Sequence, residues 1–175
     1  MPGKGLEYAL TINSLMQKIV ESQMENIERA AQIVAEAIAG NGILYTFGTG
    51  HSHVVAEDVA FRAGGLVPVD AILEASLTGH EKVRQSEYME RVEGMAAVII
   101  EYYGITSRDA LVVISNSDQA LSLAQSPIPL PAGIPEWLTP QIAIIPGQLF
   151  AYHLTRAKGY NPETPRSLHK VTQTH

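Results

Sequence analysis

Residues 43–53 constrain the fold of this chain more than any other segment. Residues 43–47 are mainly apolar, aromatic or β-branched, and Gly48 and Gly50 follow them directly. A helical pattern of apolar residues then begins and continues to the glycine pair at 64 and 65. The order of strand, glycine turn and helix is typical of a βαβ unit, so this segment predicts an α/β fold with a parallel sheet.

Helix and strand patterns alternate along most of the remaining chain. Apolar residues recur every three or four positions over residues 11–39, which predicts a long amphipathic helix ending at Gly40. The further expected elements are a strand over 66–73, a helix over 86–103, a strand over 111–114, a short helix over 118–124 and a helix over 142–158.

Two details refine this prediction. Pro68 places the second strand at an edge of the sheet, or marks its start. Residues 111–114 form an uninterrupted apolar run, which is typical of a strand buried on both faces. We therefore expect a three-layer, doubly wound α/β fold with a mostly parallel sheet, forming one domain over residues 1–175.

The composition limits the classes of partner. The chain has a net charge of −6 and a pI near 5.5, so it offers no broad basic surface to a nucleic acid or an anionic membrane. It contains no cysteine, no signal-peptide pattern and no apolar run that approaches a membrane span. We expect a cytoplasmic protein without nucleic-acid or membrane partners.

The first polar turn predicts an anion site. Gly48, Thr49, Gly50, His51 and Ser52 stand where a strand passes into a helix, and free N–H groups and the helix dipole there favour a negative charge. The hydroxyl groups add donors for a phosphate. An ordinary tight turn between strand and helix is the alternative interpretation.

Competing motifs do not fit this turn. His53 occupies the position of the third glycine in a dinucleotide fingerprint, and the Gly-Lys pair of a nucleotide P-loop is absent, so no nucleotide cofactor is expected. His51 and His53 should point in different directions at a helix start, which argues against a metal site. Both are interpreted as facing solvent or ligand, whereas His80 and Glu81 either reach the ligand or belong to a solvated loop.

A second polar turn, formed by Ser115, Asn116 and Ser117, follows the strand at 111–114. Ligands of parallel-sheet proteins bind beyond the carboxyl ends of the strands, so both turns should face one crevice. As a helix cap alone this turn would be unremarkable. Its pairing with the first turn predicts a binding site for a phosphorylated ligand.

These residues resemble the sugar isomerase (SIS) family of phosphosugar-binding domains. A small uncharacterised branch of that family is similar to this chain over residues 17–65 and 113–117. With the segment between them, these residues cover about two thirds of the chain. Residues 130–138, 146–153 and 165–170 look instead like the C-terminal part of other members, including the isomerase half of glucosamine-6-phosphate synthase. In those members the final segment folds over the sugar, which implies that Lys170 lies near the ligand unless it is a solvated tail charge.

The chain departs from the family pattern after Ser117. A parallel crossover needs about a dozen residues, and too few separate this turn from the proline-rich stretch at 126–140, so one βα unit is expected to be missing. We interpret the chain as a chimera of two branches, joined near residues 115–118 by engineering or by deletion.

Catalysis is a separate question. Family enzymes place a glutamate about where this chain has Phe61 and Arg62, whereas Glu57 lies one turn earlier. Glu57 is the candidate base and Lys170 the candidate acid of an aldose–ketose isomerase that works through an enediol. The alternative interpretation of Glu57 is a surface carboxylate that stabilises the helix dipole. His153 is a second candidate acid, although a structural role is the other interpretation.

Three functional hypotheses follow. The preferred one is a phosphosugar-binding domain without catalysis, the second is the isomerase, and the third is a scaffold without activity. The resemblance implies neither a cofactor nor a metal. We also expect a homodimer or a higher homo-oligomer, because the long first helix leaves apolar surface that a second subunit can cover.

Overall fold

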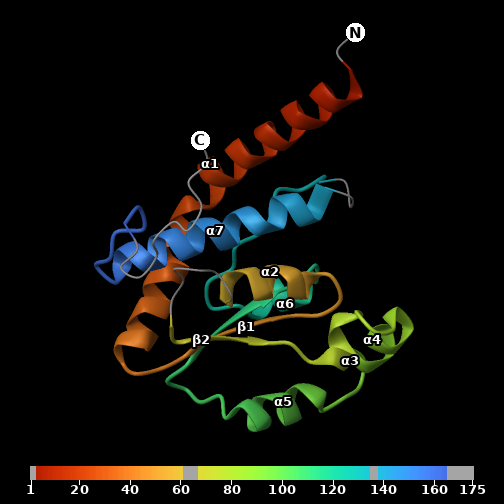
Figure 1. Ribbon diagram of the computed structural model, residues 1–175, viewed down its shortest axis with the longest axis vertical. Coiled ribbons are helices and arrows are strands. Elements are labelled where there is room, and N and C mark those ends of the chain that lie inside the picture. The colour runs from red at the N-terminus through yellow and green to blue at the C-terminus, as the bar shows by residue number, and fades with distance from the viewer. Residues whose placement is uncertain (1–2, 61–66, 135–137, 165–175) are drawn as a thin grey trace, which may run out of the picture.

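The computed structural model describes residues 3–60, 67–134 and 138–164 (Figure 1). Along the chain the elements are α1 (Lys4–Ala39), β1 (Leu44–Gly48), α2 (Ser52–Ala60), β2 (Val69–Ile72), α3 (Ala75–Thr78), α4 (Val83–Met89), α5 (Met95–Tyr103), β3 (Ala110–Ile114), α6 (Asp118–Leu123) and α7 (Thr139–Ala157).

The three strands of the described chain form one parallel sheet in the order β2-β1-β3. Leu44 at the start of β1 pairs with Val69 of β2 and with Ala110 of β3. All three strands therefore end at the same edge of the sheet. The turns after β1 and β3 belong to neighbouring strands and meet at that edge, as the alternation of elements predicts.

Helices cover both faces of this sheet, because successive side chains of a strand point to opposite faces. Leu44 belongs to a core with α1 and α7, in which Ile19, Ile27, Ile142 and Leu154 are fully buried. Tyr45 belongs to a second core with Ile72, Leu77 and Ile99. Figure 1 shows α2 and α7 on one side of the sheet and α5 on the other, so the doubly wound, three-layer fold is confirmed.

The predicted helix over residues 86–103 is wrong in one respect, because two helices occupy this part of the chain. α4 ends at Met89, and α5 begins at Met95 after Gly94, which has the left-handed φ of 82° that favours glycine. The apolar spacing continues through Val92, although this side chain is 41% exposed. The break brings Glu90, at the end of α4, to the edge where the strands end.

The prediction that residues 111–114 are buried on both faces is also wrong. β3 is an edge strand, and along it Leu111 is 42% exposed and Val113 is 50% exposed. Both pair with β1 residues, Tyr45 and Phe47, that point to the α5 side of the sheet. α5 covers that face over β1 and β2 and leaves it open over β3. No fourth strand follows within the described residues, in line with the expected loss of a βα unit.

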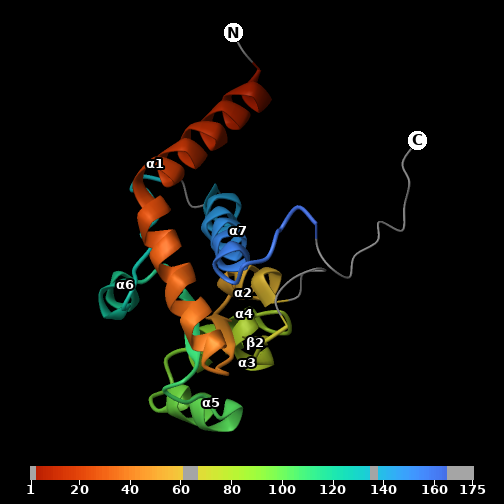
Figure 2. The same cartoon turned by 90° about the vertical axis from the view of Figure 1, so that its left-hand side faces the viewer.

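α1 begins at Lys4, earlier than the predicted residue 11, and its two halves differ in burial. The second half packs through Ile27, Ala31 and Val34 into the core shared with α7. The beginning of the helix extends beyond the other elements in two perpendicular views (Figures 1 and 2), and there Leu6 and Leu10 are more than half exposed.

Candidate functional site

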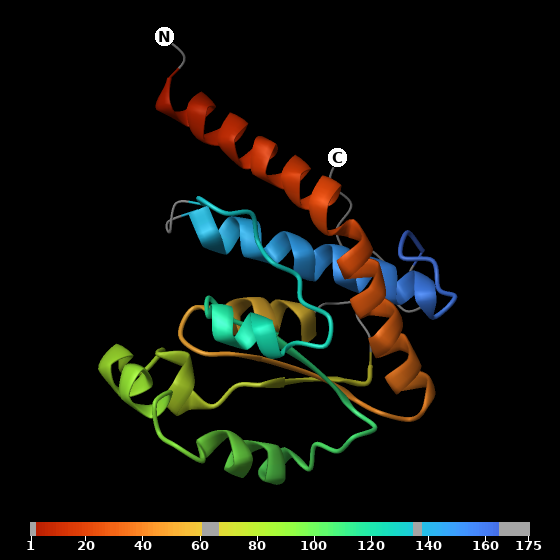
Figure 3. The ribbon, with the colours of Figure 1, turned by 180° about the vertical axis from the view of Figure 1, so that it is seen from behind.

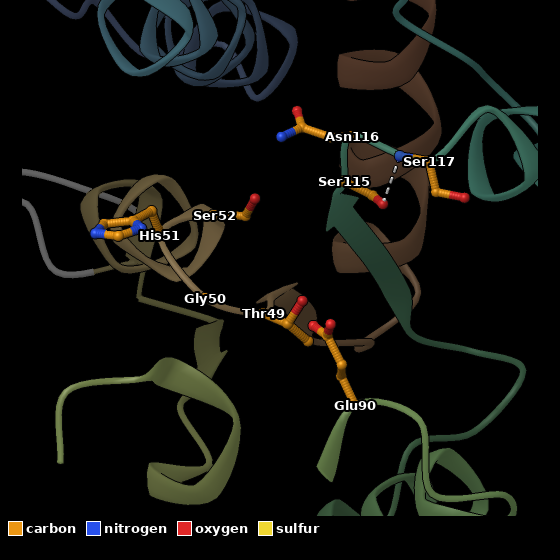
Figure 4. Close-up of a pocket in the computed structure, with 8 residues that line it drawn as sticks. All are labelled: Thr49, Gly50, His51, Ser52, Glu90, Ser115, Asn116 and Ser117. Atoms are coloured by element: carbon orange, nitrogen blue, oxygen red, sulfur yellow. Dashed lines mark hydrogen bonds between the residues drawn. The ribbon is translucent and has the colours of Figure 1, made fainter. Parts of the chain in front are cut away.

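The two polar turns line one cavity of about 430 Å³ at the carboxyl ends of β1 and β3. Figure 4 shows the first turn on one side and the second turn facing it, with Glu90 below them. The described lining residues are Thr49, Gly50, His51, Ser52, Glu90, Ser115, Asn116 and Ser117. Seven of these eight are residues that the sequence predicted for a phosphosugar site, and the structure brings them together.

Glycines shape the first turn. Gly48 does not line the cavity, but it is buried where β1 ends, and a Cβ atom there would lie 2.7 Å from the carbonyl carbon of Ser52. Only glycine therefore lets the strand pass this close to the start of α2. Gly50 has a φ of 50° and open space around its Cβ position, so its requirement for glycine comes from the backbone conformation.

The backbone N–H groups of this turn are less free than the sequence suggested. The N–H of Gly50 donates to the Leu77 carbonyl over 2.8 Å, and the N–H groups of Ser52 and His53 donate to the carbonyls of Thr49 and Gly50. His51 N–H has no backbone partner among the described residues. The hydroxyl groups of Thr49 and Ser52 likewise have no described partner, and they remain available for a ligand.

His53 lies where the sequence did not place it. The prediction that it faces solvent or ligand is wrong, because its side chain is 1% exposed. Its Nδ1 bonds to the Gly50 carbonyl and its Nε2 lies 2.6 Å from Nε2 of His80. A carbonyl oxygen only accepts, so Nδ1 carries a proton and donates it to the Gly50 carbonyl. His80 is therefore an exposed residue that supports the turn through His53.

The second turn offers two hydroxyl hydrogens. Ser115 Oγ accepts a hydrogen bond from Ser117 N–H over 3.1 Å, and Ser117 Oγ caps α6 by accepting from Ala120 N–H over 3.4 Å. Because each oxygen already accepts a backbone hydrogen bond, each hydroxyl hydrogen remains free to be donated. Asn116 extends from this turn toward the side on which Ser52 lies (Figure 4).

Sequence reasoning missed Glu90. Its side chain extends toward the first polar turn in Figure 4, and it is the one carboxylate among the described lining residues. No described residue with a lysine or arginine side chain lines the cavity. The glycine at position 94 was the sequence signal for the helix end that places Glu90 here, and in the structure it has a left-handed backbone conformation.

The other predicted residues lie elsewhere. Glu57 is half-buried on α2 and is absent from the described lining, and Lys170 lies outside the described residues. His153 on α7 has its Nδ1 3.6 Å from Glu28 of α1, so a contact within the fold accounts for it. The described residues contain no group of three potential metal ligands. No helix among them is long and apolar enough to cross a membrane.

The fold and the cavity define an α/β ligand-binding domain whose site lies at the carboxyl ends of parallel strands. A family model described as SIS domain matches residues 7–122, about two thirds of the chain. The chain belongs to the SIS domain family. Both polar turns and Glu90 lie within the matched residues.

Similar proteins come from several bacteria. A UPF0309 protein of Halalkalibacterium halodurans is 39% identical over 111 residues, which are 63% of this chain and 46% of that protein. A UPF0309 protein of Geobacillus thermodenitrificans is 35% identical over 124 residues, 71% of this chain and 47% of the relative. A UPF0309 protein of Brucella ovis is 43% identical over 91 residues, which are 52% of this chain and 38% of that protein. The chain spans about half the length of the curated relatives that it matches.

Proposed function

We propose that this chain binds a sugar phosphate in the cavity between the two polar turns. One observation carries the proposal: the turns that follow β1 and β3, separated by more than 60 residues of sequence, line the same cavity. Membership of the SIS domain family supports the same class of ligand. The phosphate would lie between Ser52 and Ser115, and the sugar would fill the remaining space.

Neutral donors would hold the phosphate. The four hydroxyl groups of Thr49, Ser52, Ser115 and Ser117 can each donate a hydrogen bond, worth roughly 1.5–3 kcal/mol to a charged acceptor before ordering costs. The His51 side chain points away from the cavity in Figure 4, so we expect this residue to contribute its backbone N–H. The net charge of −6 opposes binding weakly, because charges beyond about 8 Å are screened at physiological salt.

An aldose–ketose isomerase is the second candidate function. The observation that favours it is a carboxylate, Glu90, in the same cavity, since an enediol mechanism needs a base that moves a proton between neighbouring carbons. Glu57 would act as the base only if its helix turned toward the ligand. Solvent deuterium exchange into fructose 6-phosphate separates the two functions: we expect no exchange from a binding domain, whereas rapid exchange would make the protein an isomerase.

Calorimetric titration tests the proposed binding. The unmodified protein is titrated with a panel of hexose and heptose phosphates and with the matching unphosphorylated sugars. We expect saturable binding of at least one phosphate ester and no binding of the free sugars, because the donors of both turns act on the phosphate. A panel in which no phosphate ester binds would contradict the proposal and favour a scaffold without activity.

A further inference from the structure

Glu90 occupies an unusual position for an anion-binding cavity. Its backbone is fixed at the end of α4, where its N–H donates to the Ser86 carbonyl over 3.0 Å. Its side chain is free to extend into the cavity, and no described residue donates a hydrogen bond to its carboxylate. Its backbone caps α4, but no side-chain cap or ion pair with a described residue accounts for the position of its carboxylate.

An ionised carboxylate accepts hydrogen bonds and donates none. It repels a phosphate and complements a hydroxyl group, which donates. The described lining carries hydroxyl donors on both turns and a single acceptor anion at Glu90, so it can complement both an anion and hydroxyl groups. A ligand that fits must carry an anion and hydroxyl groups in one molecule.

We propose that Glu90 is the specificity-determining residue of this site: it accepts hydrogen bonds from the hydroxyl groups of a phosphorylated sugar and disfavours an anion without a polyol. This inference rests on the proposed function and deepens it. Inorganic phosphate can accept hydrogen bonds from the hydroxyl groups of both turns, but its negative charge then faces the carboxylate of Glu90. A sugar phosphate places its hydroxyl groups against Glu90 and removes that conflict.

The chain supplies a matched control for charge. Glu87 lies on α4, one turn before Glu90, and is exposed, yet it is absent from the described cavity lining. Glu87→Gln changes the net charge by the same amount as Glu90→Gln. Any effect shared by both variants therefore reports the general field of the protein, and an effect confined to Glu90 reports contact with the ligand.

The experiment compares the affinities of two probes, inorganic phosphate and a sugar phosphate that the unmodified protein binds, beginning with fructose 6-phosphate. Glu90→Ala should lower the affinity for the sugar phosphate about tenfold or more, because one charge-assisted hydrogen bond is lost. Glu90→Gln should weaken it less, since its amide oxygen still accepts. Both variants should bind inorganic phosphate about threefold more tightly, because a nearby like charge has been removed.

The ratio of the two affinities decides the proposal. An unchanged ratio in Glu90→Ala, or a ratio that shifts equally in Glu87→Gln, would overturn the role of Glu90 while leaving phosphosugar binding intact. Absence of sugar-phosphate binding in the unmodified protein would overturn the proposed function itself and this inference with it. Circular dichroism and thermal melting of each variant confirm that it is folded, as expected for substitutions of exposed side chains.

Discussion

His53 Nε2 lies 2.6 Å from His80 Nε2, and this contact connects the first polar turn to the segment that follows α3. A second contact supports this connection, because the carbonyl of Leu77 in α3 accepts hydrogen bonds from Gly50 N–H and from Ser86 Oγ over 2.8 and 2.7 Å. The shape of the turn after β1 therefore depends on α3 and α4 as well as on its own glycines.

Replacement of His53 should separate these contributions. His53→Leu leaves the Gly50 carbonyl without its side-chain donor, and we expect a loss of about 1–3 kcal/mol in the free energy of unfolding together with weaker sugar-phosphate binding. His53→Asn should lose less, because its amide can donate to the same carbonyl. Urea unfolding and calorimetry check both quantities. Equal losses in the two variants would show that burial, and not the bond to Gly50, explains the residue.

Gly50→Val should abolish sugar-phosphate binding in a folded protein. The φ of 50° is strained for a β-branched residue, so the turn must change shape even though nothing lies within 4 Å of the new Cβ atom. Gly104→Val is the matched control, since Gly104 has a φ of 65° and open space but stands at the end of α5. We expect similar thermal destabilisation of both variants and loss of binding in Gly50→Val alone. Unchanged affinity in folded Gly50→Val would remove this turn from the site.

Asp109 should make stability depend on pH in the acid range. Hydrogen bonds from the N–H groups of Ile43 and Thr106, and from the Thr106 hydroxyl, hold its pKa below the ordinary value. The stabilisation is present above the unfolded pKa of about 4 and is lost as the pH falls through the lower folded pKa.

Asp109→Asn should therefore lower the free energy of unfolding by about 1 kcal/mol at pH 7. The difference in this free energy from the unmodified protein should shrink below pH 4. Urea unfolding at pH 7 and pH 3 measures both values. Glu101→Gln, at an exposed position on α5, is the control and should show no such convergence. A difference that stays constant with pH would mean that the ionised carboxylate is not what joins the segment before β1 to the turn before β3.

The elements that carry the two polar turns were predictable from local sequence. Residues 43–47 form a short apolar run closed by glycine, and β1 (Leu44–Gly48) agrees with it within one residue. The second polar turn was predictable in the same way, because residues 115–117 directly follow the apolar run at 111–114. Two parallel strands then bring their carboxyl ends to one edge, and this geometry explains why the residues of both turns were found without a structure.

The rest of the site depends on contacts that no local pattern contains. The burial of His53 follows from His80, which is 27 positions further along the chain. Glu90 was missed because apolar residues continue at helical spacing through Met89, Val92 and Met95, so the pattern concealed the helix end between them. Exposure of Val113 follows from the position of β3 in the sheet, and the composition of the strand cannot reveal that position.

The first half of α1 predicts self-association, and we propose a homodimer. Leu6, Leu10 and Val20 are 53%, 58% and 45% exposed and lie on one stripe of α1. The beginning of this helix projects beyond the other elements (Figure 3). In an isologous dimer the same stripe of a second copy would cover it.

The double variant Leu6→Glu, Leu10→Glu should reduce the mass measured by light scattering from dimer to monomer. The core should survive, since Leu15 and Ile19 face inward. Thr11→Glu with Ser22→Glu adds the same charge at exposed positions off this stripe and should leave the mass unchanged. A monomeric mass for the unmodified protein at micromolar concentration would contradict the proposal, and a dimer that persists in the leucine variant would move the interface away from α1.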